Sequence, residues 1–282
     1  RGIGDKRGQL FFEFMRILAD KQPKFFLAEN VSGMLLERHG KVLENIKEMF
    51  SQCGYVLSFN MLNASDYNVP QDRKRVFFIG YRKDLAIKFN FPKPSTAECK
   101  ITLEQAIGDL KNYVLPAKSL NYSNGENCEI PNHEFMIGDF SPMYMSRNRV
   151  RSWDEVSFTI QAGGRHAPIH PQAPKMKFIE QNKREFVKGK KGLYRRLSVR
   201  ECARIQTFPD SFIFHYKHIS AGYKMIGNAV PVELARAIAE KIYHDLKTKK
   251  IIKKVNGKMY KSKNILSGLL VKERMLEIVN SY

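Results

Sequence analysis

Phe25-Phe26-Leu27-Ala28-Glu29-Asn30-Val31 is the stretch that most directly predicts the fold of this chain. Its first four residues form a short apolar run, which suits a strand buried in a sheet. Apolar residues at helical spacing lie before it in 10–18 and after it in 42–50. Strand-like stretches follow at 55–62 and 76–81. This alternation predicts an α/β domain with a mainly parallel sheet.

The rest of the chain divides by composition. After an α/β domain at 1–90, residues 91–194 are rich in Pro, Asn, Ser, Gly and aromatic residues, which predicts a smaller, loop-rich lobe. Helical periodicity returns in 195–249, where Ser198–Glu201 has the pattern of a capping box. Residues 250–282 form a basic extension. The lysine-rich stretch 241–263 is either a solvated tail or a contact for phosphates.

The net charge is the first indication of function. The 282 residues carry a formal charge of +20, which predicts attraction to a polyanion, most commonly nucleic acid. A basic surface or a membrane-facing patch is the alternative. No apolar run reaches the roughly 18 residues of a transmembrane helix, and no signal peptide is expected. We therefore expect no membrane partner.

The cysteines suggest neither a metal site nor a disulfide framework. The chain has four of them, with no CxxC pair: Cys53, Cys99, Cys128 and Cys202. Scattered single cysteines are typical of a protein in a reducing, cytosolic compartment. We therefore expect no bound metal and a cytoplasmic location.

Five sequence blocks occur along the chain in an order typical of one family. They are 7–13, 29–31, 71–75, 196–210 and 222–231. Together they resemble the later motifs of the bacterial DNA cytosine-5 methyltransferases, over roughly residues 1–245. The resemblance implies a Rossmann-like, S-adenosylmethionine-dependent fold, with the loop-rich lobe as the target-recognition domain.

The resemblance implies an acid and two arginines at the catalytic centre. Glu29 would hydrogen-bond N3 of a flipped cytosine and make C6 electrophilic. Arg73 and Arg75 would hold the base and its acidic partner, because a guanidinium fork suits both tasks. From the residues alone, Glu29 could equally cap a helix or form a salt bridge, and the arginines could be solvated charges at a sheet edge.

A cofactor site is implied at two blocks. Leu10 would lie beside the adenine of S-adenosylmethionine, and Asn228 and Ala229 belong to the turn that closes this site in the family. The alternatives are a plain core leucine and an ordinary Gly-Asn turn.

The loop-rich lobe also resembles a known recognition domain. Residues 145–153 and 158–165 are similar to the corresponding segments of restriction-modification enzymes that methylate GGCC. Three arginines fall there: Arg147, Arg149 and Arg165. A guanidinium can bind O6 and N7 of guanine together, although a phosphate contact is the alternative. Thr159 matches a family threonine that holds the phosphate beside the flipped nucleotide.

The family mechanism needs a cysteine that the four present do not supply. The thiolate attacks C6, and C5 then takes the methyl group from S-adenosylmethionine. The family nucleophile follows a proline, whereas these cysteines follow Gln52, Glu98, Asn127 and Glu201. The glycine-rich cofactor loop is not recognised either. We expect an enzyme that methylates duplex DNA only when a complementary N-terminal segment or subunit is present.

Two other functions remain open. The chain could be a recognition subunit or inactive fragment that reads DNA without chemistry, or an RNA cytosine methyltransferase. A degenerate copy would be expected to lose Glu29 or the arginine pair, and a long arginine-bearing lobe suits duplex DNA better than RNA. The expected setting is the bacterial cytoplasm, in association with the nucleoid.

Overall fold

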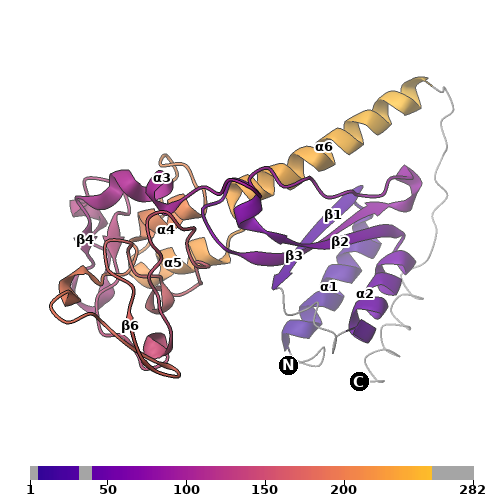
Figure 1. Ribbon diagram of the computed structural model, residues 1–282. Helices are drawn as coiled ribbons and strands as arrows, with labels where there is room; N and C mark the ends of the chain where they lie inside the picture. Colours follow the sequence, from indigo (N-terminus) through magenta and orange to yellow (C-terminus); the bar gives the residue numbers. More distant parts are fainter. Residues whose placement is uncertain (1–5, 32–39, 256–282) are drawn as a thin grey trace. The chain divides into compact units, whose positions relative to one another are not determined.

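The molecule is a mixed α/β protein, as the sequence predicts (Figure 1). The structure is a computed structural model, and it describes residues 6–31 and 40–255. Contacts divide the chain into two compact units. Of the described residues, the first contains 6–31, 40–62, 74–92 and 238–255, and the second contains 63–73 and 93–237. Most of the expected basic extension, from residue 256 onward, lies outside the described residues.

The first unit is built on a three-stranded sheet of order β1-β3-β2. Its elements are α1 (Lys6–Lys21), β1 (Phe25–Val31), α2 (Gly40–Gln52), β2 (Tyr55–Asn63), β3 (Lys74–Arg82) and most of α6 (Val232–Val255). β1 runs antiparallel to β3, with Phe25 opposite Tyr81 and Val31 opposite Arg75. The expectation of a mainly parallel sheet is wrong for this pair. Apolar runs report the burial of a strand and not its direction.

β3 is buried on both faces because its sequence is almost continuously apolar. Val76 and Phe78 join the core formed with α1 and α2, which also contains Phe26. On the strand's other face, the Tyr81 hydroxyl donates a hydrogen bond to Asp245 of α6 at 3.0 Å. Gly80 is required opposite Phe26, since a Cβ there would lie 2.1 Å from the Phe26 ring. Helices thus stabilise both faces of this strand.

The second unit is rich in loops, as its composition predicts. Its main elements are α3 (Leu103–Ile107), β4 (Leu115–Pro116), β5 (Glu134–Phe135), β6 (Lys177–Glu180), β7 (Lys183–Glu185), α4 (Val199–Ile205) and α5 (Ile219–Asn228). One core lies among α3, α4 and α5. A separate cluster, which includes Tyr144, Val150, Ile169 and Tyr194, supports the loops at 144–150 and 169–176.

The unit boundaries differ from those expected at 90 and 195. Residues 63–73 belong to the second unit, where Asp72 N donates to Ser157 O at 2.9 Å. α4 and α5 also belong there, because their apolar faces form its core. The chain returns to the first unit at Ile238, within α6. The sequence places helices correctly, but it does not show which core they complete.

Candidate functional site

Glu29 and Arg75 form an ion pair on one face of the first unit's sheet. Glu29 lies opposite Phe77, so Arg75 is its diagonal neighbour across the β1–β3 ladder. Arg75 Nε lies 2.9 Å from Glu29 Oε1, and the side chains keep 18% and 25% of their surface exposed. The structure therefore brings together an acid and an arginine that the sequence predicted as partners. The same pair also satisfies the salt-bridge alternative for Glu29.

Arg73 has a different environment from Arg75. Its side chain is 2% exposed. Nη1 donates to Ile160 O at 3.1 Å, and Nη2 donates to Gly227 O at 3.1 Å and to Ala229 O at 3.2 Å. These contacts give Arg73 a backbone-positioning role that the sequence prediction did not anticipate. They do not support a direct contact between Arg73 and a base.

Two buried glutamines accompany Arg73. Gln71 Nε2 donates to Gln206 Oε1 at 3.1 Å, and neither side chain is exposed. Both residues lie within the family-like blocks, but nothing in the sequence pairs positions so far apart. Their pairing was therefore not predicted, although a glutamine directly after the apolar helical run at 199–205 indicates a buried polar group that needs a partner.

The residues predicted at the cofactor site differ in exposure. Leu10 on α1 is 68% exposed, so it is not the plain core residue of the alternative interpretation. Asn228 ends α5 with an exposed side chain, and Ala229 follows in extended conformation with φ −73° and ψ 152°. Ala229 O accepts from Arg73, which fixes the turn. The roles of Leu10, Asn228 and Ala229 at a cofactor site stay predictions.

The three predicted base-reading arginines are not equivalent. Arg147 and Arg165 are exposed, whereas Arg149 is 8% exposed. Arg149 Nε donates to Tyr144 O at 2.8 Å, and its guanidinium lies 4.6 Å from the centre of the Tyr144 ring. Burial, and then repulsion from Arg147, lowers the pKa of Arg149. These contacts support a structural role for Arg149 and leave the other two available to a ligand.

The hydroxyl of Thr159, the predicted phosphate contact, already forms a hydrogen bond within the protein. Its Oγ1 donates to Asp72 O at 2.6 Å, and the side chain is half-buried. The hydroxyl would have to rotate away from Asp72 to donate to a phosphate. The structure thus ties Thr159 to the segment that carries Arg73.

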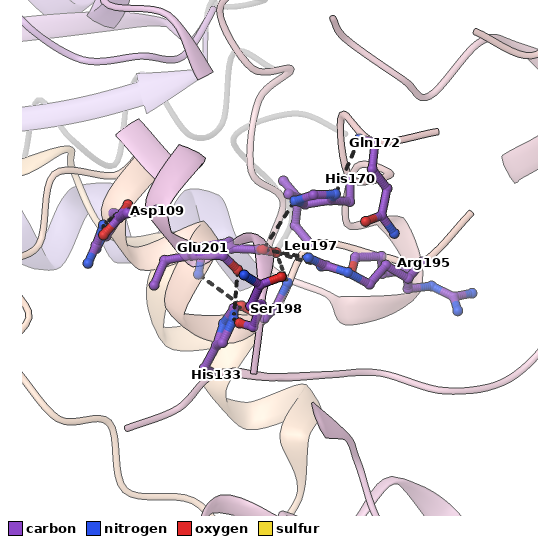
Figure 2. A network of polar contacts seen from close by, with 12 residues as sticks. Asp109, His133, His170, Gln172, Arg195, Leu197, Ser198 and Glu201 are labelled. Carbon is purple, nitrogen blue, oxygen red and sulfur yellow. Dashed lines mark hydrogen bonds and ion pairs between the residues drawn. The ribbon is translucent and has the colours of Figure 1, made fainter. Parts of the chain in front are cut away.

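A buried polar network lies at the start of α4 (Figure 2). Ser198 and Glu201 form the predicted capping box, which the structure confirms. Arg195 donates to both oxygens of Glu201 at 2.7 and 2.8 Å, and His170 Nε2 lies 3.4 Å from Oε1. His133 Nδ1 lies 2.9 Å from Ser198 Oγ. This network joins α4 to the loop at His170.

The protonation states in this network follow from its contacts. His170 Nδ1 accepts from Gln172 N, so the neutral ring carries its proton on Nε2, facing Glu201. Burial lowers the pKa of His170 to about 4. Burial alone would raise the pKa of Glu201, but Arg195 outweighs it and lowers that pKa to about 2. The network is therefore an ion pair of Glu201 and Arg195 with a neutral histidine beside it.

Three of the four cysteines do not have the environment of a nucleophile. Burial raises the pKa of Cys53 and of Cys128 to about 11, and that of Cys202 well above its usual value. Cys99 is exposed. A reactive thiol needs a lowered pKa, which burial in apolar surroundings opposes. Among the described residues no cluster of His, Cys, Asp or Glu could hold a metal ion, and no helix is long and apolar enough to cross a membrane.

Comparison with known proteins identifies the family. The model of the C-5 cytosine-specific DNA methylases matches residues 1–244. The chain belongs to this family. Type II methyltransferase M.FnuDI of Fusobacterium nucleatum is 52% identical over 255 residues, covering 90% of this chain and 74% of the relative. Type II methyltransferase M.NgoPII of Neisseria gonorrhoeae is 56% identical over 244 residues, covering 86% and 71%.

Solved structures show the same fold for this C-5 cytosine methylase. An Escherichia coli prophage protein described as a putative DNA modification methyltransferase matches with a TM-score of 0.62 and 23% identity, covering 86% of this chain and 75% of that one. The Dnmt2 methyltransferase of S. pombe matches with a TM-score of 0.56 and 17% identity, covering 88% and 75%. S-adenosyl-L-methionine is the methyl donor of this family.

Proposed function

We propose that this chain provides the acid and the DNA-reading part of a type II DNA (cytosine-5-)-methyltransferase. The enzyme transfers a methyl group from S-adenosyl-L-methionine to C5 of a flipped cytosine in a GGCC duplex, within a restriction-modification system. Support comes from relatives named as type II methyltransferases, from the net charge of +20 and from the Glu29–Arg75 pair. The ion pair is the observation that carries the chemistry.

Glu29 and Arg75 have complementary tasks in this proposal. Glu29 forms a hydrogen bond with N3 of the flipped cytosine, which makes C6 electrophilic. Arg75, with Nε 2.9 Å from Oε1, holds the carboxyl group at one position on the sheet. Positioning of this kind fixes the direction of the hydrogen bond before the base arrives. S-adenosyl-L-methionine supplies the methyl group when bound.

Sequence reading falls to Arg147 and Arg165 in this proposal. Their exposed guanidinium groups can bind O6 and N7 of guanine, whereas Arg149 supports the loop that carries Arg147. Thr159 contacts the phosphate beside the flipped nucleotide after its hydroxyl leaves Asp72 O. The target is duplex DNA in the bacterial cytoplasm, at the nucleoid.

Residues 1–282 alone are proposed to be inactive. Three of the four thiols have raised pKa values, and none follows a proline. A complementary segment, either continuous with this chain or a separate subunit, supplies the nucleophile and the glycine-rich cofactor loop. The alternative is a recognition subunit without chemistry of its own. An RNA substrate is disfavoured by the arginine-bearing lobe.

The proposal is tested by Glu29→Gln in the enzyme completed with that segment. We expect methyl transfer to slow by roughly 10²–10⁴-fold, because one positioned acid is worth that much. Duplex affinity should remain within about threefold, since the acid is not a main DNA anchor. Arg75→Lys is the matched control, because it keeps the charge and loses the fork. Turnover of Glu29→Gln near that of the wild type would remove Glu29 from the mechanism.

A further inference from the structure

Arg73 forms the first of two polar bridges between Ile160 and the C-terminal end of α5 with the turn that follows it (residues 226–229). Arg73 is only 2% exposed, and its guanidinium spans the two segments directly. Nη1 donates to Ile160 O at 3.1 Å, while Nη2 donates to Gly227 O at 3.1 Å and Ala229 O at 3.2 Å. A single planar group thereby fixes the carbonyls of both segments at one spacing.

The second bridge uses the other polar group of Ile160. Ile160 N donates to Gln71 Oε1 at 3.0 Å, and Gln71 Nε2 donates to Gln206 Oε1 at 3.1 Å. Gln206 Nε2 then donates to Ile226 O at 2.8 Å and to Ala229 O at 3.3 Å. The N–H and the C=O of Ile160 are thus both linked to the same turn, through different side chains.

The two segments also touch directly. A Cβ on Gly227 would lie 2.3 Å from the carbonyl carbon of Gln161, so only glycine permits this approach. A buried polar group that loses its hydrogen bond without gaining a new partner destabilises the protein. Moving one segment without the other would break several of these hydrogen bonds at once. These contacts oppose a movement of one segment relative to the other.

We propose that Gln71, Arg73 and Gln206 are positioning residues that couple the DNA side of the site to its cofactor side. In the proposed function Thr159 contacts the phosphate, and the family resemblance predicts that the turn at 228–229 closes the cofactor site. The inference rests on the proposed function and on this predicted role of the turn. A ligand that orders one segment also orders the other, so the second ligand loses less conformational entropy on binding.

Thermodynamic linkage makes this coupling measurable from either side. If cognate duplex tightens cofactor binding by some factor, the cofactor tightens duplex binding by the same factor. Allosteric coupling in proteins is typically about 5–150-fold. Breaking a bridge should reduce this factor while leaving each separate affinity largely intact. A residue that only stabilises the fold would instead lower the unfolding midpoint and leave the factor unchanged.

Gln206→Met is the central test, because methionine fills a similar volume and cannot donate to the turn. The wild-type enzyme, completed with its N-terminal segment, is first shown to transfer methyl groups to DNA. Calorimetry then gives its affinity for S-adenosylhomocysteine with and without a cognate GGCC duplex. We expect coupling in the wild type and a reduction of the coupling factor by at least about threefold in the variant. A folded variant with an unchanged factor, or a wild type without coupling, overturns the proposal.

Two further variants separate the bridge from a general loss of stability. Gln71→Met combined with Gln206→Met should reduce coupling no more than either change alone, because both break the same bridge. Arg73→Lys keeps the charge and loses the fork, so it should reduce coupling as well. Full coupling in Arg73→Lys would show that only the charge matters, and would contradict the bridging role.

Hydrogen exchange of the backbone amides in ligand-free residues 1–282 tests the bridge independently of the proposed function. Gln206→Met should speed the exchange of the Ile160 amide, although residue 206 does not contact it, because Gln71 loses its anchor. The amides of α3 serve as an internal reference. If the wild-type enzyme transfers no methyl group, the proposed function fails, and this exchange still decides the bridge. Unchanged exchange at Ile160 would overturn it.

Discussion

Replacing Glu201 by glutamine should destabilise the second unit strongly. Glu201 is fully buried and accepts two hydrogen bonds from Arg195, at 2.7 and 2.8 Å. Breaking a buried ion pair costs about 3–5 kcal/mol, and the remaining amide oxygen recovers roughly 1 kcal/mol as a neutral acceptor. The free energy of unfolding should therefore fall by about 2–4 kcal/mol. The capping box itself survives, since α3 uses Gln105 at the equivalent position.

The single tryptophan offers a local assay. Trp153 lies edge-on to His170, with ring centroids 5.1 Å apart, so its fluorescence reports unfolding around the Glu201 network. The urea midpoint should fall without a change in slope. Glu104→Gln is the control, because its ion pair with Lys111 is about half exposed and worth about 0–1 kcal/mol. A loss below about 1 kcal/mol for Glu201→Gln would refute the assigned role of the ion pair.

Three other outcomes follow from the structure. Unfolding monitored by Trp153 should require less urea as the pH falls from 6.5 to about 4. Burial lowers the pKa of His170 in the folded state, so the unfolded state binds a proton at this histidine first. An unchanged urea midpoint over that range would contradict this prediction. Arg147→Ala should reduce the preference for GGCC over substituted duplexes by about 1–3 kcal/mol, whereas Arg149→Ala should mainly lower the unfolding midpoint. Equal losses of specificity in the two variants would contradict the different roles assigned to these arginines. Gly227→Ala should reduce both methyl transfer and the unfolding midpoint, since the new Cβ would lie 2.3 Å from the carbonyl carbon of Gln161. Wild-type values for both quantities would refute that close approach.

The α/β class and most helices could be predicted because they depend on local patterns. The capping box at 198–201 and the apolar run of β1 are visible in single segments of sequence. Strand direction could not be predicted, since antiparallel pairing of β1 with β3 leaves the same apolar pattern as parallel pairing. The assignment of α4 and α5 to the second unit was also hidden, because periodicity shows that a face is buried but not what covers it.

The candidate site shows the same limit. Glu29 and Arg75 could be named as partners because a family resemblance placed them together, and the structure shows the contact. Arg73 and Arg149 were expected to meet bases, but their guanidinium groups satisfy backbone carbonyls inside the second unit. Whether an arginine binds a ligand or the backbone depends on its burial, which a short motif does not encode.

Methyl transfer measured together with the position of the methyl group tests the central claim most directly. Residues 1–282 would be incubated with tritiated S-adenosylmethionine and a GGCC duplex, alone and with a complementary N-terminal segment. Digestion to nucleosides then identifies the labelled product. The proposed function predicts 5-methylcytosine within GGCC from the completed enzyme and no incorporation by the chain alone. Label in any other nucleoside, label outside GGCC, or 5-methylcytosine formed by residues 1–282 alone would contradict it.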